Sequence, residues 1–410
     1  MKTVCCANMP YVAEAFETLG ETVVKDGRAL VAADVRDADL LAIRSTTRAN
    51  RALLDGSRVR FVGTATIGTD HLDIPWLEEQ GICWRYAPGC NANSVSEYVT
   101  VALLCLANRD GLTLRGKTIG IVGVGNVGGR VVDKARALGL RVLANDPPRQ
   151  RAGEAGHASL TEPGETVPFV GLDAIRREAD IVTFHVPLIR EGPDRTVHLA
   201  DAAFFAGLKP GAILVNSARG PVVDSEALLA ALDSGLVRHC VLDTWEGEPA
   251  YRRDVLARAA MATPHIAGHS FEGKVMGTAM VYREACRFLG REPDWTPDAL
   301  LPAPTVPRVE LDVDGRSDEQ ALWELTRAVY DIEADDRALR ATAAPGFAPP
   351  AETPPDKPAH AAGFDCLRKN YPIRREFRFT QAVLRHAGPA LRETVRRLGF
   401  AMADQDGAEP

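Results

Sequence analysis

The sequence predicts an α/β protein with two doubly wound, Rossmann-like domains and a small α+β domain at the C-terminal end. Three observations lead to this prediction: apolar runs alternate with helical patterns over residues 1–107, the alternation restarts near residue 108, and prolines separate a third unit. A chain of 410 residues has room for two or three domains, each with its own core. The expected division is a discontinuous first domain (1–107 and 262–292), a second domain (108–261) and a third domain (293–410).

The first domain is expected to contain one parallel sheet, because helical patterns at Tyr11–Leu19 and Ile74–Gln80 separate its apolar runs. An apolar helix is predicted from Ser94 to Ala107. Ser94 has the residue type of an N-cap, and Glu97 three positions later completes a capping-box pattern. The runs predicted as strands are Thr3–Cys6, Thr22–Val24, Leu40–Ile43, Phe61–Thr64 and Ile82–Arg85.

The second domain opens with a predicted strand, Lys117–Val122, which runs directly into the segment Gly123-Val-Gly-Asn-Val-Gly128. A helix follows to about residue 138, and the stretch 149–171 is interpreted as an exposed insertion. The predicted apolar face of the helix consists of Val127, Val131, Ala135 and Leu138. The remaining predicted strands are Arg141–Asn145, Ile181–His185, Ala212–Asn216 and Val241–Asp243.

The C-terminal part is expected to be small and interrupted by prolines. A helix is predicted over Met276–Leu289, ahead of a proline-rich linker. The tail is then expected to form a strand at Arg308–Val313, a helix from Asp318 to Ile332, and an Arg-rich helix over Gln381–Leu398. Six prolines between Pro345 and Pro358 predict an extended polyproline-type loop.

The composition argues against several classes of protein. The net charge is −7, so the chain gains no long-range attraction to the phosphate backbone of a nucleic acid. No window approaches the ~18 apolar residues of a membrane span, and the N-terminus turns polar before a signal-peptide core could form. The eight cysteines are scattered without a C-x-x-C pair, which favours reduced thiols in a cytoplasmic protein and no metal site.

The glycine-rich segment has the context of a dinucleotide-binding fingerprint, because it follows a strand, opens a helix and precedes an acidic residue at the next strand end. Gly123 permits the tight turn, Gly125 lets the backbone approach a pyrophosphate, and Gly128 lets the helix pack closely on the sheet. The helix N-terminus favours phosphate. Asp146 can accept hydrogen bonds from ribose hydroxyls and would repel a 2′-phosphate, so NAD is favoured over NADP. The alternative is an ordinary glycine-rich turn.

Four later segments carry polar residues at predicted strand ends, where doubly wound sheets bind ligands. An Arg, a Glu and a His from these segments suit the oxidation of a 2-hydroxy acid. Arg can hold a carboxylate bidentately, His can accept the hydroxyl proton, and Glu can orient the imidazole and stabilise its charged form. The segments are Phe184-His-Val-Pro-Leu188, Val215-Asn-Ser-Ala-Arg-Gly220, Leu242-Asp-Thr-Trp-Glu-Gly-Glu-Pro249 and Thr263-Pro-His-Ile-Ala-Gly268.

Each of these residues also has an ordinary structural interpretation. A lone arginine is usually a surface charge, Glu248 could be a turn residue before Pro249, and His265 could be a loop histidine with satisfied hydrogen bonds. His185, beside Pro187 at a strand end, is interpreted as a loop support rather than a base.

Seven motifs bear on the family. They are Asn8-Met-Pro-Tyr11, Arg44-Ser-Thr-Thr47, Gly63-Thr-Ala-Thr-Ile-Gly-Thr-Asp-His71, Ala87-Pro-Gly-Cys-Asn91, Gly120-Ile-Val-Gly-Val-Gly-Asn-Val-Gly128, Asp146-Pro-Pro-Arg149 and Phe364-Asp-Cys-Leu-Arg-Lys-Asn-Tyr-Pro372. Together with the four segments above, they resemble the D-isomer-specific 2-hydroxyacid dehydrogenase family, essentially over residues 1–290. The resemblance narrows to the branch that oxidises 4-phospho-D-erythronate, whose extra C-terminal dimerisation domain carries the last motif.

This resemblance implies a reaction and an assembly. The expected activity is the NAD-dependent oxidation of 4-phospho-D-erythronate to (R)-3-hydroxy-2-oxo-4-phosphooxybutanoate, in pyridoxal 5′-phosphate (vitamin B6) biosynthesis. The expected protein is a cytoplasmic homodimer that takes a small phosphorylated 2-hydroxy acid. Its first domain would bind the substrate, its second domain NAD, and its third domain the partner chain.

The resemblance also implies roles for individual residues. Arg219 and Glu248 are implied to be catalytic, with His265 as the proton donor or acceptor. Substrate contacts are implied for Ser45 and Thr66. The residues expected at the NAD site are Gly123, Gly125, Asn126, Val127, Gly128, Asp146, Val186, Ser217, Ala218, Asp243 and Gly268.

The phosphate of the substrate needs several hydrogen-bond donors. We expect Arg44 to join Ser45 and Thr66 in binding it, although Arg44 could equally be a solvated charge at a strand end. His269 stands where the family carries a tyrosine that contacts the substrate, and a protonated imidazole there would add a positive charge.

Two other functions are compatible with these residues. Another D-2-hydroxyacid dehydrogenase, acting on 3-phosphoglycerate or glycerate, would share the first two domains but carry a different C-terminal domain or none. A NAD-sensing binding protein of the corepressor type would share the fold, since a fold alone does not fix a function. The combination of Arg219, Glu248 and His265 argues against the binding protein.

Overall fold

The computed structural model describes residues 1–159 and 165–403 of the chain. Contacts within it divide the chain into two compact units. The first unit consists of Met1–Asn93 with His269–Ala303, and the second of Ser94–Gly268 with the residues from Pro304 onward. Over the described ranges, the structure contains no helix of the length and apolar character that a membrane span requires. The assignment of substrate binding, NAD binding and dimerisation to three separate domains stays a prediction.

The first unit is built on a five-stranded parallel sheet, which confirms the strands predicted there. The strand order is β2-β1-β3-β4-β5, the doubly wound arrangement in which the chain winds outward in both directions. The strands are β1 (Lys2–Cys6), β2 (Glu21–Lys25), β3 (Leu40–Ile43), β4 (Phe61–Thr64) and β5 (Cys83–Tyr86). The helices are α1 (Val12–Glu17), α2 (Ala32–Val35), α3 (Arg51–Leu54), α4 (Ile74–Glu79) and α12 (Phe271–Phe288).

Two glycines let α12 lie close to β4 and the residue that follows it. A Cβ atom on Gly63 would lie 2.3 Å from Val281 Cγ1, and one on Gly277 would lie 2.9 Å from the carbonyl oxygen of Ala65. This close packing fixes the carboxyl end of β4, from which Thr66 follows.

The second unit contains a six-stranded parallel sheet with the order β13-β12-β11-β10-β6-β7. The order reverses at β6, which has β7 on one side and β10 on the other, and doubly wound sheets bind ligands at such a point. The strands are β6 (Thr118–Val122), β7 (Arg141–Asn145), β10 (Ile181–Phe184), β11 (Ala212–Asn216), β12 (Val237–Leu242) and β13 (Met261–Ala262). The helices that follow the chain through this sheet are α5 (Ala92–Asp110), α6 (Asn126–Ala137), α7 (Pro147–Arg151), α8 (Leu172–Glu178), α9 (Ala202–Ala206), α10 (Ser225–Asp233) and α11 (Arg253–Arg258).

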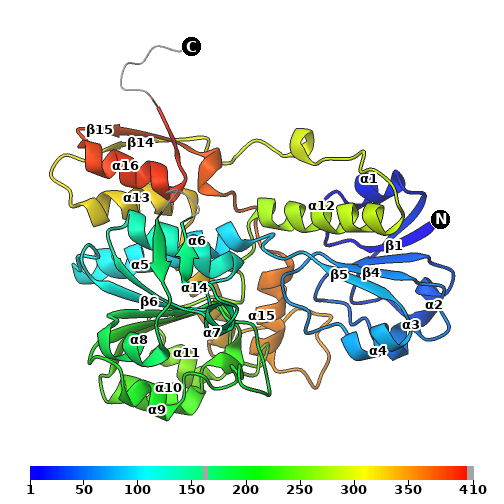
Figure 1. Cartoon of the computed structure of the whole chain (residues 1–410), viewed down its shortest axis with the longest axis horizontal. Helices are drawn as coiled ribbons and strands as arrows, with labels where there is room; N and C mark the ends of the chain where they lie inside the picture. Colours follow the sequence, from blue (N-terminus) through cyan, green and yellow to red (C-terminus); the bar gives the residue numbers. More distant parts are fainter. Residues whose placement is uncertain (160–164, 404–410) are drawn as a thin grey trace. The chain divides into compact units, whose positions relative to one another are not determined.

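Apolar side chains of this sheet alternate between two buried faces. Ile121 and Val215 pack on the face covered by α5 and α6, where the predicted apolar side of α6 also lies. Val182 and Leu214 pack on the opposite face with residues of α8, α9, α10 and α11. Figure 1 shows α5 and α6 on one side of β6 and α8 to α11 on the other.

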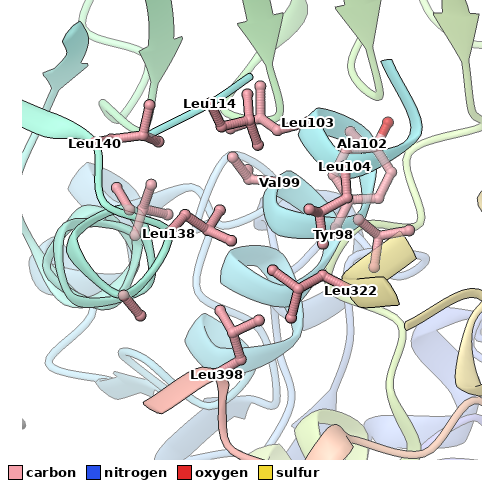
Figure 2. Close-up of a cluster of buried hydrophobic side chains, with 14 of the residues drawn as sticks. Tyr98, Val99, Ala102, Leu103, Leu104, Leu114, Leu138, Leu140, Leu322 and Leu398 are labelled. Carbon is pink, nitrogen blue, oxygen red and sulfur yellow. The ribbon is translucent and has the colours of Figure 1, made fainter. Parts of the chain in front are cut away.

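The tail after Pro304 shares a hydrophobic core with α5 and α6. Leu322 and Leu398 come from the tail and pack with Val99 of α5 and Leu138 at the end of α6, as Figure 2 shows. Removing the tail would therefore expose an apolar face of the second unit. Its strands form a parallel sheet of order β14-β15-β16, namely β14 (Arg308–Asp312), β15 (Gln381–Arg385) and β16 (Ala401–Met402). Its helices are α13 (Asp318–Val329), α14 (Ile332–Ala343), α15 (Ala359–Lys369) and α16 (Pro389–Leu398).

Two predictions for the tail were wrong in detail. The stretch Gln381–Leu398 is not one helix: it begins with β15, whose alternate residues Ala382 and Leu384 are buried, and α16 starts only at Pro389. The helix predicted from Asp318 to Ile332 ends at Val329. The side chain of Asp331 then caps a second helix, α14, by accepting a hydrogen bond from the backbone of Ala334.

Two predictions nearer the N-terminus also need correction. Ser94 is not an N-cap, because α5 begins at Ala92 and the Ser94 hydroxyl is buried, donating to Glu376 at 3.3 Å. The insertion 149–171 is not wholly exposed. Its strands β8 (Gly156–Ala158) and β9 (Thr166–Pro168) pair antiparallel, and Phe169 is buried in the core that contains residues of α5 and α6. Residues 160–164 of the insertion lie outside the described residues.

A group of buried charges joins α5, α6 and the tail. Glu97 accepts a hydrogen bond from the backbone N–H of Phe377 at 3.1 Å, and Lys134 donates to the carbonyl of Leu398 at 2.7 Å. Burial, reinforced by the negative charge of Glu376, raises the pKa of Glu97 to about 8. Glu97 is therefore largely protonated at neutral pH.

This shift predicts a pH-dependent stability. Because the pKa of Glu97 is higher in the folded chain than in the unfolded chain, its contribution to stability is complete below about pH 4.5 and is lost as the pH rises through about 8. The melting temperature of the wild type should fall by a few degrees between about pH 6 and about pH 9. Glu97→Gln, which stays neutral, should flatten this fall in a calorimetric scan, whereas the exposed Glu393→Gln should leave it unchanged. An equal fall in both variants would contradict the shift.

Candidate active site

The glycine-rich loop after β6 has the geometry that a dinucleotide requires. Gly123 has a positive φ of 86°, and a Cβ atom on Gly128 would lie 2.0 Å from the carbonyl oxygen of Gly123, so glycine is required at both positions. A Cβ atom on Gly125 would meet no described atom within 4 Å, which leaves the backbone open at the start of α6. The loop therefore fits a pyrophosphate held by the N–H groups at that helix N-terminus.

Asp146 lies at the carboxyl end of β7, beside this loop. Its Oδ2 accepts a hydrogen bond from the backbone N–H of Val124 at 2.9 Å, and its Oδ1 accepts one from Arg149 at 3.2 Å. The carboxylate thus fixes the glycine loop and caps α7. Each oxygen keeps a second lone pair, so a ribose hydroxyl could still donate to it.

Arg149 is the nearby cation that could bind a 2′-phosphate, but other partners hold its side chain. Its Nε donates to Glu154 at 2.9 Å and its Nη1 to the carbonyl of Val124 at 2.5 Å, and the guanidinium lies over the ring of Phe169 at 5.2 Å. The hydrogen bond with Glu154 raises the pKa of Arg149 above its usual value. The like charge of Asp146 and this restraint both disfavour NADP.

The other residues expected at the NAD site lie at the same edge of the sheet, because each follows the carboxyl end of a parallel strand. Val186 follows β10 and packs against Gly123, since a Cβ atom on Gly123 would lie 2.8 Å from Val186 Cγ1. Asn126 and Val127 form the first turn of α6. The remaining ones are Ser217 and Ala218 after β11, Asp243 after β12, and Gly268 after β13.

His265 and Glu248 form the hydrogen-bonded pair that the sequence suggested. His265 Nδ1 lies 2.6 Å from Glu248 Oε1, and the other oxygen of Glu248 accepts a hydrogen bond from the backbone N–H of Trp245 at 3.1 Å. Burial alone would raise the pKa of Glu248, but the charge and hydrogen bond of His265 hold that pKa below its usual value. Within the described part of the chain, His265 Nε2 makes no hydrogen bond, so this nitrogen is available to a ligand.

The loop that carries His265 is fixed by Asp243. His265 has a left-handed backbone, with φ 56°, which costs a non-glycine residue about 1–3 kcal/mol. Asp243 Oδ1 accepts hydrogen bonds from the hydroxyl of Thr263 and the backbone of Ile266, both at 2.7 Å, and its Oδ2 accepts one from Ala267 at 3.0 Å. Burial raises the pKa of Asp243. Its predicted contact with NAD stays a prediction.

The same loop is also fixed from the tail. Arg374, which is buried, donates from Nη2 to the carbonyl of Ala267 at 2.5 Å and lies 4.3 Å from the ring centroid of Tyr330. Tyr98 of α5 lies 2.8 Å from the Thr263 hydroxyl. Sequence reasoning missed both residues, because each is far along the chain from the loop and neither belongs to a motif with a recognised role.

Arg219 follows β11 in a loop stiffened by Asn216, whose side chain bonds the carbonyl of Arg219 at 3.0 Å and the N–H of Ala218 at 3.1 Å. The next residue, Gly220, touches the backbone of Trp245, since a Cβ on it would lie 2.0 Å from that carbonyl. The structure therefore places Arg219 beside the loop that presents Glu248. His185, by contrast, is half-buried, and desolvation of its imidazole lowers its pKa to about 3, so it stays neutral and is not a base.

The four expected substrate residues all belong to the first unit. Arg44 and Ser45 follow β3 and Thr66 follows β4, so these three lie at the carboxyl edge of that sheet. The Thr66 hydroxyl donates to the carbonyl of Gly68 at 2.8 Å and lies 2.8 Å from the Thr64 hydroxyl. His269 precedes α12.

Comparisons with known proteins find two family models and several named relatives that match the chain. The family model described as the D-isomer specific 2-hydroxyacid dehydrogenase, NAD binding domain, matches residues 105–267, and a domain of unknown function (DUF3410) matches residues 300–399. The chain is 48% identical over 383 residues to a protein of Edwardsiella ictaluri (strain 93-146) named erythronate-4-phosphate dehydrogenase, covering 93% of this chain and 95% of that one. A protein of the same name from Klebsiella pneumoniae (strain 342) is 45% identical over 401 residues, 98% of each chain.

The solved structure of the TT0316 protein from Thermus thermophilus matches with a TM-score of 0.58 and 27% identity, over 72% of this chain and 99% of that one. The alignments with the two enzyme relatives therefore extend into the tail, whereas the alignment with the Thermus protein leaves more than a quarter of this chain unmatched.

The Glu248–His265 pair predicts a pH effect. A neutral amide at position 248 can still accept the hydrogen bond from Nδ1 but no longer stabilises a charged imidazole. Glu248→Gln should lower kcat by about 10²-fold, and the pH at which oxidation reaches half its maximal rate should move lower.

Steady-state rates across pH measure both effects. Glu246→Gln removes the analogous carboxylate beside His198, at 2.6 Å, and serves as the matched control. The pairing would be refuted by a profile that stays in place in Glu248→Gln.

Cofactor preference gives a second prediction. The ratio of kcat/KM for NAD over NADP should exceed one in the wild type and narrow by about tenfold or more in Asp146→Asn, which keeps an acceptor but loses the charge. Adding Glu154→Gln should narrow it further, because Arg149 is then less restrained. A wild type that prefers NADP would show that Arg149 already binds the 2′-phosphate.

Proposed function

The chain belongs to the erythronate-4-phosphate dehydrogenases of the D-isomer-specific 2-hydroxyacid dehydrogenase family, and we propose that it oxidises 4-phospho-D-erythronate to (R)-3-hydroxy-2-oxo-4-phosphooxybutanoate in pyridoxal 5′-phosphate biosynthesis. The observation that carries this proposal is the hydrogen-bonded pair of Glu248 and His265, at the carboxyl edge of an NAD-binding sheet. The presence of an intact acid–base pair favours a dehydrogenase over a NAD-sensing binding protein.

The residues at this edge of the sheet have separate roles in the reaction. His265 Nε2 accepts the proton of the C2 hydroxyl, and Glu248 balances the charge that the imidazole gains. Arg219 holds the carboxylate of the substrate through its guanidinium, which fixes C2 beside His265. NAD, bound at the glycine loop, supplies the acceptor for the hydride that leaves C2.

We assign the substrate contacts of the first unit to Arg44, Ser45, Thr66 and His269. Arg44 is half-buried at the end of β3, and Ser45 beside it is exposed. The Thr66 hydroxyl proton is already used on Gly68, so Thr66 is better suited to accept a hydrogen bond from a substrate hydroxyl than to donate one to the phosphate. Among the residues of the first unit, this leaves Arg44, Ser45 and His269 as the donors for the phosphate.

The phosphate should therefore dominate specificity. Charge-assisted hydrogen bonds contribute roughly 1.5–3 kcal/mol each, so losing two should lower kcat/KM by about 10²–10⁴-fold. Incubation with NAD and either 4-phospho-D-erythronate or D-erythronate, followed by NADH absorbance and identification of the 2-oxo product, measures the difference. Arg44→Ala should reduce the rate with the phosphorylated acid far more than the rate with the bare acid. Equal kcat/KM for the two acids in the wild type would leave only a generic 2-hydroxyacid dehydrogenase.

We also propose that the protein is a cytoplasmic homodimer. All eight cysteines are free thiols, which suits a reducing compartment. In the described part of the chain, β14 pairs with β15 alone, so its outer edge presents unpaired backbone groups. A second copy could pair with this edge about a two-fold axis.

This edge provides a test of the dimer. The N–H of Val313 points to β15, where it donates to Arg385 at 3.1 Å, and successive N–H groups alternate in direction, so the N–H of Glu310 points to the open edge. Glu310→Pro should remove one interchain donor without breaking the β14–β15 pairing, and should shift the sedimentation coefficient from dimer to monomer. Glu310→Gln keeps the N–H and should stay dimeric. If Glu310→Pro also remains a dimer, the interface lies elsewhere.

A further inference from the structure

The tail helix α15 covers the loop that presents Glu248. Phe364 of α15 is fully buried, with its ring centroid 5.8 Å from that of Tyr251, and Tyr251 in turn lies 5.3 Å from Trp245. The Tyr251 hydroxyl lies 2.9 Å from the hydroxyl of Thr342 on α14. Aromatic contacts on both sides of Glu248 thus fix α15 against this loop, within the second unit.

Arg368 lies one turn beyond Phe364 on the same face of α15. Its guanidinium lies over the ring of Phe364, at 5.8 Å. Its Nε is buried without a hydrogen-bond partner. Over the described residues, Arg368 forms no ion pair with a carboxylate and donates no hydrogen bond to the protein.

Other arginines of the tail serve as structural supports. Arg374 donates to the carbonyl of Ala267, and Arg340 donates to the carbonyls of Leu256 and Ala259 while pairing with Asp336. Arg368 has no such role. A charged donor that is partly buried and unpaired costs free energy, and a ligand that completes its hydrogen bonds recovers this cost.

The charge of Arg368 reaches the catalytic pair. Burial raises the pKa of Glu248, and His265 and then the charge of Arg368 lower it below its usual value. The guanidinium is therefore within electrostatic range of the site where His265 meets the C2 hydroxyl, and only C3, C4 and an ester oxygen separate C2 from the phosphorus of the substrate.

The substrate carries two anionic groups, and the second unit offers Arg219 for only one of them. A phosphate monoester holds about −1.5 to −2 charges at neutral pH and pairs best with the planar fork of an arginine. We infer that Arg368 binds the 4-phosphate of the substrate, so that the tail supplies a phosphate contact from the same unit that holds Arg219 and His265. This inference rests on the proposed function.

Two substitutions test it. Arg368→Met keeps much of the length of the side chain and its contact with Phe364 but removes the positive charge. Arg368→Lys keeps the charge but loses the planar guanidinium that binds a phosphate through two N–H groups. The matched control is Lys369→Met, because Lys369 is the neighbouring cation on α15 and is exposed. Each variant is assayed with NAD and with 4-phospho-D-erythronate and D-erythronate in turn, across pH.

For Arg368→Met we expect kcat/KM with the phosphorylated acid to fall about 10²-fold or more, chiefly through KM, and to fall far less with the bare acid. Arg368→Lys should recover part of this loss, and Lys369→Met should behave as wild type. Inorganic phosphate should inhibit oxidation of the bare acid by the wild type, and Arg368→Met should weaken this inhibition.

Equal losses for the two acids, or a pH profile displaced as in Glu248→Gln, would overturn the inference, because Arg368 would then act on Glu248 rather than on the phosphate. A wild type that oxidises neither acid would instead refute the proposed function. The two failures are therefore distinguishable.

Discussion

The carboxylate of Asp243 is buried at the end of β12, where it accepts hydrogen bonds from one hydroxyl and two backbone N–H groups of the Thr263–Gly268 loop. These bonds hold His265 in a left-handed conformation, a strained geometry that a free loop would not keep. The position of the imidazole, and therefore its pairing with Glu248, depends on this one carboxylate. Charge-assisted bonds to backbone donors of this kind are strong enough to offset the strain.

The tail also makes contacts with this loop and with the strand end that precedes it. Arg374 holds the carbonyl of Ala267, and Asp336 accepts a hydrogen bond from the backbone of Ala262 at 2.7 Å. Leu322 and Leu398 at the same time complete the core over α5 and α6. The tail is therefore part of the catalytic unit, in addition to any role in pairing two chains.

Sequence reasoning succeeded where the signal is local. The glycine loop, Asp146 and the strands around them follow from short motifs whose residues are adjacent in the chain, and the pairing of Glu248 with His265 followed from the chemistry of two nearby segments.

Sequence reasoning failed where contacts with residues far along the chain determine the local structure. Ser94 has the pattern of a cap, but a buried partner 282 positions away uses its hydroxyl. The strand β15 has helix-compatible residues and becomes a strand because β14 and β16 pair with it on both sides. Arg374 and Arg368 sit in an arginine-rich segment that gives no sign of which guanidinium supports a loop and which one stays unpaired.

The packing of the tail on α5 and α6 has a consequence for biosynthesis. Lys134 and Leu398, which meet in the finished core, are 264 positions apart. At roughly 5–20 residues per second, a ribosome needs about 13–53 s to travel between them. The sheet of the second unit is complete only once β13 (Met261–Ala262) has been made, and from then until Leu398 the nascent unit lacks the side chains that cover one of its helical layers. We therefore expect the emerging chain to present an apolar surface to chaperones until the segment that contains Leu398 has been made.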